Sequence, residues 1–403
     1  MTSSPFLTRV ALKNFKSLAA CDVTLGPLSF LVGPNGAGKS NFLDGLRFVA
    51  DSLRTSLEHA LRQRGGINEV RRRSGGHPNH FGMRLWFTLS SGSSGYYSFR
   101  IGARTQGGFE VQEEECEVRS GDTLEDAHCF RVESGVVVRG TDAGPATSID
   151  RLFLVTASGS PAFRPVCEAL SRMGFYNLNP DRIRDLQSPD AGQLLARDGS
   201  NITSVLAHMT KHSPERKLRI EEYLSKIVPG VCGVDVKVIG PKETLEFRQQ
   251  VAGSKEPWRF QAANMSDGTV RALGILAALF QSGTEGGPGA SLVGIEEPEI
   301  AFHPAAAGLL RDGLKEASQA TQVIVTSHSG DLLDDGELGQ DSVLAVYGEE
   351  GSTHIAPLDR SSREALLRRL YTPGELLRMD QLRPDPGASP EKIEKQLRLF
   401  EHS

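Results

Sequence analysis

The chain has 403 residues, of which 38% are hydrophobic and 24% charged, a balance typical of a folded protein with roughly two or three domains. A net charge of −5 argues against a uniformly basic surface that coats nucleic acid, although it leaves room for a local basic patch. The five cysteines form no C-x-x-C pair, so neither a zinc site nor a disulfide framework is predicted. Without an apolar leader or a run of about 18 apolar residues, we expect a cytoplasmic protein with no membrane partner.

The first elements lead into a phosphate-binding motif. Strands are expected over 7–15, 21–25 and 29–32, and the third runs directly into Gly33–Ser40, which matches G-x-x-x-x-G-K-[ST] at every fixed position. Glycines let the backbone wrap around a phosphate, so that consecutive N–H groups and the start of the next helix face one anion. Lys39 is expected to reach the β- and γ-phosphates and Ser40 to place its hydroxyl on Mg²⁺. The motif predicts ATP binding by Asn35, Gly36, Gly38, Lys39, Ser40 and Asn41.

The next part of the chain changes from helix to strand and back. A helix is predicted from Asn41 to about Arg64, followed by strands over 83–90, 96–101, 108–118 and 130–138 and by helical segments within 150–228. Arg62, Arg64 and Arg71–Arg73 form the densest basic cluster. Two interpretations of this cluster stay open: a solvated helix end, or a contact with the phosphate backbone of DNA.

The remaining chain alternates apolar strands and helices. Strands are expected over 234–239, 244–250, 258–262, 291–295 and 322–326, and helices over 270–281 and 305–320. Strands alternating with helices predict a parallel sheet. We therefore divide the chain into an N-terminal lobe with an antiparallel β subdomain (1–145), a helical insertion (146–230), a C-terminal lobe (231–382), and a hinge with a short helix (383–403).

Polar residues at the ends of two predicted strands suggest the second half of a nucleotide site. Glu296 and Glu297 follow one strand, and His328 follows the next. Ligands collect at the carboxyl ends of parallel strands, so His328 is predicted to face the γ-phosphate. Glu296 is a candidate Mg²⁺ ligand, and Glu297 is the candidate general base for the attacking water.

A third polar segment precedes the helix predicted over 270–281. Ser266, Asp267 and Gly268 offer a hydroxyl and backbone N–H groups at the start of this helix. Such a start makes an anion-binding surface, although Ser266 or Asp267 alone is also typical of an ordinary N-cap.

The order of these segments resembles the ATP-binding-cassette ATPases, and more closely their RecF/SMC-like branch. The head also resembles that of the AAA-type ATPases related to overcoming-lysogenization-defect nucleases. Five motifs carry the resemblance: Leu12–Ser17, the phosphate loop, Ser266–Thr269, Ile295–Glu299 with His303-Pro304, and Thr326–Ser329. The implied fold is α/β: a P-loop NTPase with an ABC/SMC-like head, in which a mixed sheet carries an antiparallel β subdomain and a helical insertion.

The resemblance implies a head that dimerises around two ATP molecules. Ser266 and Gly268 would meet the γ-phosphate bound to Lys39 of the other subunit, and His303 would lie in the dimer-contact loop. Three features depart from the relatives. Glu296 replaces the usual Asp, Asn179 is only a weak candidate for the glutamine that senses the γ-phosphate, and no acid-rich nuclease module follows His328.

Two functions stay open. The first is an ATP-hydrolysing switch, a homodimer or higher even oligomer that acts with DNA or with an effector such as a nuclease, in DNA repair or anti-phage defence. The second is a scaffold that binds ATP with little turnover and holds an effector. A transporter cassette is disfavoured, because such a cassette keeps its phosphate loop and carboxylates closer than Lys39 and Glu296 lie in this sequence.

The C-terminal tail is the last predicted element. Arg383–Pro390 is predicted to be a hinge that detaches the final residues of the chain, and Glu391–Phe400 a short helix with one apolar face. A free helix of this length is marginal in water, so the face is expected to dock either on its own head or on a partner.

Overall fold

The computed structural model describes residues 5–74, 78–121, 127–140, 148–281, 289–302, 304–336, 338–388 and Ile393. His303 lies outside the described residues, as does the predicted helix Glu391–Phe400 apart from Ile393. The chain forms two compact units, each described by itself. We call residues 174–335 the helical unit, and residues 4–173 with 336–403 the β unit.

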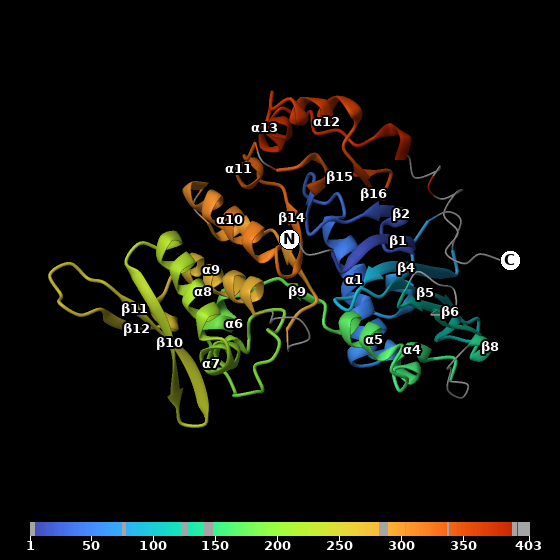
Figure 1. Ribbon diagram of the computed structural model, residues 1–403, viewed down its shortest axis with the longest axis horizontal. Helices are drawn as coiled ribbons and strands as arrows, with labels where there is room; N and C mark the ends of the chain where they lie inside the picture. The colour runs from blue at the N-terminus through green and yellow to red at the C-terminus, as the bar shows by residue number, and fades with distance from the viewer. Residues whose placement is uncertain are drawn as a thin grey trace. The chain divides into compact units, whose positions relative to one another are not determined.

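The β unit is built on a mixed sheet whose strands run in the order β8-β7-β6-β5-β4-β1-β2-β16-β15-β3. Neighbours pair antiparallel from β8 to β2, whereas β2–β16 and β15–β3 are parallel pairs. The strands are β1 (Leu7–Phe15), β2 (Leu18–Thr24), β3 (Leu28–Val32), β4 (His80–Thr88), β5 (Ser94–Ala103), β6 (Phe109–Arg119), β7 (Ala127–Glu133), β8 (Val136–Gly140), β15 (Val343–Glu349) and β16 (Ser352–Pro357). The predicted antiparallel β subdomain is therefore present (Figure 1).

The helices of the β unit are short except for the one that follows the phosphate loop. They are α1 (Lys39–Arg54), α2 (Leu57–Arg62), α3 (Ile67–Val70), α4 (Phe153–Ala157), α5 (Arg164–Ser171), α12 (Arg360–Leu367) and α13 (Pro373–Arg378). Helix α1 packs on the sheet through Phe48, whose ring lies 5.4 Å from Phe81, 6.1 Å from Phe15 and 6.2 Å from Phe99, centroid to centroid. Aromatic contacts of this kind add about 0.5–1.5 kcal/mol each beyond simple burial, so the helix is held firmly against β1, β4 and β5.

Two predicted elements of the β unit are each split in the structure. The helix expected from Asn41 to Arg64 breaks after Arg54, because Ser56 is extended and its hydroxyl caps α2 by accepting the His59 N–H at 3.1 Å. The strand expected over 130–138 is a hairpin. Ser134 and Gly135 at its turn both have positive φ, at 45° and 81°, the geometry of a tight two-residue connection.

The start of the predicted hinge is bonded to the β unit. The Asp359 N–H donates to the Arg383 carbonyl at 2.9 Å, and the Asp385 N–H donates to the Pro357 carbonyl at 2.8 Å. Farther along, Ile393 packs against Ala11 and Ala20 beside Trp86. Of the two docking sites left open for the tail, this contact favours its own head.

The helical unit contains three parallel strands in the order β14-β13-β9 and a separate antiparallel sheet, β10-β11-β12 (Figure 1). The strands are β9 (Gly174–Tyr176), β10 (Val231–Ile239), β11 (Lys242–Gln249), β12 (Trp258–Gln261), β13 (Leu292–Glu296) and β14 (Gln322–Ser327). The helices are α6 (Pro180–Arg184), α7 (Ile202–His212), α8 (Pro214–Ile227), α9 (Asp267–Phe280), α10 (Ala307–Ala317) and α11 (Gly330–Leu333). Strand β9 was not predicted, because three buried residues are too short to show a strand period.

Helix α9 is the centre of the helical unit. Ten of its residues are buried, so it is apolar around most of its circumference rather than along one stripe. It contacts both α8 and α10. A helix enclosed in this way gives its N-terminal turn, which carries Ser266 and Asp267, a fixed position within the unit.

A buried carboxylate in the β unit gives a first testable expectation. Glu114 of β6 accepts the N–H groups of Phe153 and Leu154 at 2.5 and 2.8 Å, and the Tyr97 hydroxyl at 3.0 Å. Burial raises the pKa of Glu114 to about 7, and these three donors only partly oppose that rise. The folded protein therefore binds this proton more tightly than the unfolded chain does. The resulting stabilisation is fully present below the ordinary Glu pKa of 4.5 and is lost as the pH rises through about 7.

We expect this proton to contribute at most about 3 kcal/mol to the free energy of unfolding at acid pH. From pH 5 to pH 8, the free energy of unfolding of the wild-type protein, measured by chemical denaturation, should fall relative to that of Glu114→Gln, whose amide does not titrate. The same difference between the two proteins at both pH values would show that Glu114 does not titrate in this range.

Candidate functional site

The phosphate loop connects β3 to α1 in the β unit, and two of its glycines are required by close packing. A Cβ on Gly33 would lie 1.9 Å from the Val346 carbonyl oxygen, and one on Gly38 would lie 1.8 Å from the Thr353 hydroxyl. Gly36 and Gly38 also have positive φ, at 80° and 97°. The loop therefore takes its shape from a backbone that other residues do not readily adopt.

Lys39 is buried at the base of this loop, with a relative exposure of 4%. Its Nζ donates to the carbonyl oxygens of Gly33 at 2.9 Å and Pro34 at 3.1 Å. The exposed residues of the loop include Asn35 and Ser40. The loop thus presents backbone and a hydroxyl to solvent around a buried cation, an arrangement that suits a polyphosphate.

A hydrogen-bonded group supports the loop through residues distant in sequence. The hydroxyls of Ser17 and Thr353 lie 2.6 Å apart, and the Asn41 side-chain amide donates to Ser17 at 2.6 Å. Asn41, predicted to bind the nucleotide, is thus engaged with Ser17 in the structure. Ser17 lies in the Leu12–Ser17 motif, but its contact with Thr353 was not predicted, because no local pattern links the two residues.

Helix α1 is anchored by a buried carboxylate and three cations. Asp44 forms ion pairs with Lys16 at 2.7 Å and Arg64 at 3.0 Å, and also with Arg47. Burial alone would raise the pKa of Asp44, but the charges of Arg64, Arg47 and Lys16 outweigh it and hold that pKa below its usual range. Arg64 therefore has a structural role within the fold and is not part of a solvated helix end.

The rest of the basic cluster is also engaged within the β unit. Arg71 donates to Asn68 and to the Pro78 carbonyl, and Arg72 to Ser352. These contacts give the cluster an internal role in the described structure. They do not add support to the interpretation as a DNA contact.

In the helical unit, Glu296 ends β13 and Glu297 follows it in the left-handed conformation, with φ 43° and ψ 58°. The Glu297 N–H donates to the carbonyl of Thr326 in β14 at 2.9 Å and to its hydroxyl at 3.2 Å. A non-glycine residue in this conformation costs of the order of 1–3 kcal/mol, and such strain gathers at functional sites. Here it falls on the residue predicted to be the general base.

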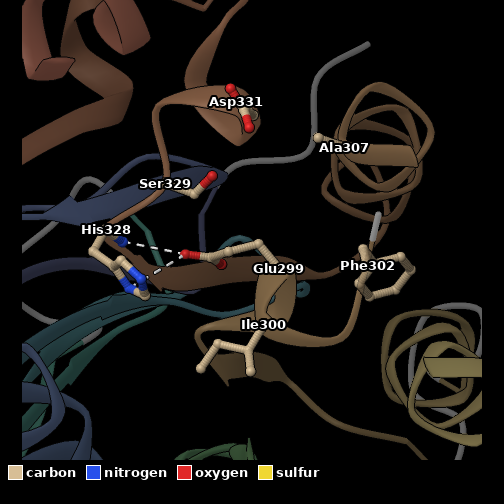
Figure 2. Close-up of a pocket in the computed structure, with 7 residues that line it drawn as sticks. All are labelled: Glu299, Ile300, Phe302, Ala307, His328, Ser329 and Asp331. Atoms are coloured by element: carbon tan, nitrogen blue, oxygen red, sulfur yellow. Dashed lines mark hydrogen bonds and ion pairs between the residues drawn. The ribbon is translucent and has the colours of Figure 1, made fainter. Parts of the chain in front are cut away.

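His328 follows β14, and its ring lies between two carboxylates. Its Nδ1 is 3.5 Å from Glu297 Oε1 and 3.8 Å from Glu299 Oε1. Figure 2 shows the Glu299 side chain directed toward His328 beside a cavity of about 280 Å³ that Phe302 and Ser329 also line. The structure thus brings Glu297 and His328 together at the ends of two adjacent parallel strands.

Two arginines that sequence analysis did not select contact predicted site residues. Arg197 forms an ion pair with Glu296 at 3.1 Å. Arg184 of α6 donates to the Met265 carbonyl at 2.8 Å and pairs with Asp267. Neither arginine lies in a motif. Their contacts could not be predicted from the sequence, because the partner residues lie far along the chain.

The segment with Ser266 begins α9. The Ser266 hydroxyl accepts the Thr269 N–H at 3.3 Å as the N-cap, and both Ser266 and Asp267 are exposed. Gly268 is half-buried. Asn179, the candidate for the γ-phosphate sensor, instead caps α6 by accepting the Asp181 N–H at 2.9 Å.

Solved structures with a similar fold are heads of SMC proteins. A Smc head bound to the C-terminal winged-helix domain of ScpA aligns with a TM-score of 0.56 and 14% identity, over 89% of this chain and 99% of that structure. A Smc head domain with an extended coiled coil, bound to a C-terminal domain of ScpA from Pyrococcus furiosus, gives 0.51 and 12%, over 91% and 99%. These similarities confirm the predicted fold class, an α/β fold with an SMC-like head.

A family profile described as "AAA domain, putative AbiEii toxin, Type IV TA system" matches residues 28–116 and 143–335, and the chain belongs to this family. Two curated relatives match shorter segments. The OLD nuclease of Thermus scotoductus is 45% identical over 51 residues, which are 13% of this chain and 10% of that protein. The replication and repair protein RecF of Vibrio vulnificus is 42% identical over 64 residues, 16% of this chain and 17% of RecF. The chain thus spans less than a fifth of each relative's length.

Membrane spans and metal clusters are both missing from the described residues. None of the described helices is long and apolar enough to cross a lipid bilayer. Among the described residues, no group of three or more His, Cys, Asp and Glu side chains is suited to hold a metal ion.

Proposed function

We propose that the protein is a Mg²⁺-dependent ATPase that works as a switch, in which two copies close around ATP and open after hydrolysis. One observation carries the hydrolytic part of this proposal. The ends of β13 and β14 place the Glu297 carboxylate 3.5 Å from the His328 ring, in a backbone turn that is strained at Glu297. A carboxylate beside an imidazole at the carboxyl ends of parallel strands suits activation of a water molecule.

The residues of the phosphate loop have the chemistry to hold the triphosphate. Gly36 and Gly38 supply the wrapped backbone, and Lys39 supplies the buried ammonium group. When phosphates bind, we expect the Lys39 ammonium to exchange the Gly33 and Pro34 carbonyls for phosphate oxygens, which make stronger charge-assisted hydrogen bonds.

Ser40 and Glu296 are the residues that would hold Mg²⁺. The Ser40 hydroxyl is exposed and the Glu296 side chain is 20% exposed, so both are accessible to a hydrated cation. A site with few protein ligands suits this ion, because Mg²⁺ keeps several waters and takes substrate phosphates as further ligands. When bound, it would neutralise charge that develops on the phosphates.

Within the site, Glu297 would accept the proton of the attacking water and His328 would contact the γ-phosphate. Arg197 pairs with one oxygen of Glu296 at 3.1 Å, so a cation at Glu296 would bind its second oxygen or displace this arginine. An effector protein or DNA is the partner we propose, in DNA repair or anti-phage defence.

The basal rate of phosphate release, with Mg²⁺ and with EDTA, tests the proposal. Turnover that requires Mg²⁺ supports the switch, and stimulation by duplex DNA that fades at high salt would identify DNA as the partner. ATP binding without turnover under all these conditions would support the scaffold alternative.

The dimer rests on the exposed start of α9, where Ser266 and the positive end of the helix dipole face solvent. Ser266→Arg should leave ATP binding by the monomer within a few-fold of wild type, because Ser266 would contact the nucleotide of the other subunit. The same substitution should abolish the ATP-induced doubling of mass, because the arginine fills the contact.

Light scattering with and without ATP, in a Glu297→Gln background that retains ATP, measures this effect. Gln319→Arg is the matched control, since it adds the same side chain at an exposed position after α10. An unchanged ATP-induced mass in the Ser266→Arg protein would exclude the shared site.

A further inference from the structure

Glu299 is a third carboxylate at this site, and neither a motif nor the proposed mechanism gives it a role. It lies in the single turn Pro298–Ala301 that follows Glu297, and its side chain is only 9% exposed. Its Oε1 accepts the Ser327 hydroxyl at 2.7 Å and the His328 backbone N–H at 3.2 Å. Glu299 thereby joins the turn after β13 to the last residue of β14.

The second oxygen of the same carboxylate has no hydrogen-bond partner, although it is buried. A buried carboxylate oxygen without a donor is unfavourable, because the oxygen has lost water and gained nothing in exchange. A nearby donor that reaches this carboxylate in another state of the site would explain the arrangement. The Nδ1 of His328 lies 3.8 Å from its other oxygen, Oε1 (Figure 2).

The His328 ring is held by neither neighbour at full hydrogen-bond distance. Its Nδ1 lies 3.5 Å from Glu297 and 3.8 Å from Glu299, and both separations exceed the usual 2.7–3.2 Å for an N–H···O bond. A general base is useful only while its oxygen is available to water. A ring N–H that settles on Glu297 would occupy that oxygen, whereas one that settles on Glu299 would leave it available.

From this geometry we propose that Glu299 is the positioning residue for His328: its carboxylate takes the Nδ1–H of the ring and so leaves Glu297 available for water. The proposal rests on the proposed ATPase function for its catalytic consequence. The placement of the ring and its tautomer do not depend on that function. Because two carboxylates lie near Nδ1, Glu299 fixes the ring in the tautomer that carries its proton on Nδ1 and leaves Nε2 unprotonated.

The test uses three substitutions in the full chain. Glu299→Gln keeps an oxygen acceptor for Ser327 and the His328 N–H but removes the charge. Glu299→Ala removes both, and Asp312→Asn removes a carboxylate at an exposed position of α10 as the matched control. Thermal melting of each variant shows that it is folded.

The first readout is the tautomer of His328, measured by long-range ¹H–¹⁵N spectra of histidine-labelled protein without nucleotide. The signal is assigned by its loss in His328→Gln among the ten histidines. We expect mainly the Nδ1–H form in wild type and in Asp312→Asn. The Nε2–H form should gain population in Glu299→Gln and more in Glu299→Ala.

The second readout is steady-state ATPase. Both Glu299 variants should lose about tenfold or more in kcat, while the KM for ATP stays within about twofold, because no contact with the nucleotide is removed. If Glu299→Gln matches wild type in tautomer and in kcat, Glu299 merely supports the turn and the proposal is wrong. If the wild type has no ATPase, the proposed function fails, while the spectra still decide the placement of the ring.

Discussion

Glu297→Gln should lower kcat for ATP hydrolysis by about 10²–10³-fold while leaving ATP affinity nearly unchanged. The amide has the shape of the carboxylate but does not accept a proton from water, and loss of a general base typically has this effect. It corresponds to about 3–4 kcal/mol of transition-state stabilisation. Because binding persists, ATP-bound dimers should accumulate.

Single-turnover hydrolysis with labelled ATP, alongside equilibrium binding, measures both parts of this expectation. Glu350→Gln is a suitable control, since Glu350 is an exposed carboxylate that also has a positive φ, of 48°. It should leave kcat unchanged. Wild-type turnover in Glu297→Gln would remove Glu297 from the role of general base.

The parts of the site that sequence analysis found are those in which chemistry constrains neighbouring residues. Phosphate binding requires glycines, a lysine and a hydroxyl within one turn, so Gly33–Ser40 is visible as a pattern. The strands β13 and β14 are buried and mainly apolar, and polar residues come at the carboxyl end of each. Glu297 and His328 were therefore predictable as neighbours from the sequence alone.

Support from distant residues was not predictable. Ser17 and Thr353, whose hydroxyls meet beneath the loop, are separated by 336 positions, and Arg197 and Glu296 by 99. No period or local spacing encodes such pairs, because the fold alone brings them together. Glu299 differs from these, since it stands within a recognisable motif, yet only its contacts with Ser327 and His328 give it a role.

Errors in the predicted elements also have physical causes. The break between α1 and α2 depends on one capping hydroxyl, that of Ser56, inside a continuous helical pattern of apolar residues. The hairpin at Ser134 and Gly135 depends on two positive φ angles within a run that otherwise has the pattern of one strand. One or two residues decided each outcome against the average preference of the segment.

Lys39→Ala should weaken ATP binding by at least about a hundredfold, or about 3 kcal/mol. The substitution removes the only side-chain cation that the motif supplies to the phosphates, and charge-assisted hydrogen bonds of this kind contribute about 1.5–3 kcal/mol. In the nucleotide-free protein the same change leaves the Gly33 and Pro34 carbonyls without the ammonium donor. A loss of about 1–2 kcal/mol in the free energy of unfolding is therefore expected as well.

Thermal melting with and without MgATP separates these two effects. Lys211→Ala is the control, because it removes one ammonium group from the exposed end of α7. A ligand that binds only the folded state raises the melting temperature in proportion to its occupancy. Wild type and Lys211→Ala should therefore show the same rise on adding MgATP, and Lys39→Ala should melt lower without nucleotide and gain nothing with it. An equal rise in Lys39→Ala would mean that ATP binds elsewhere, and that the loop around Gly33–Ser40 serves only the fold.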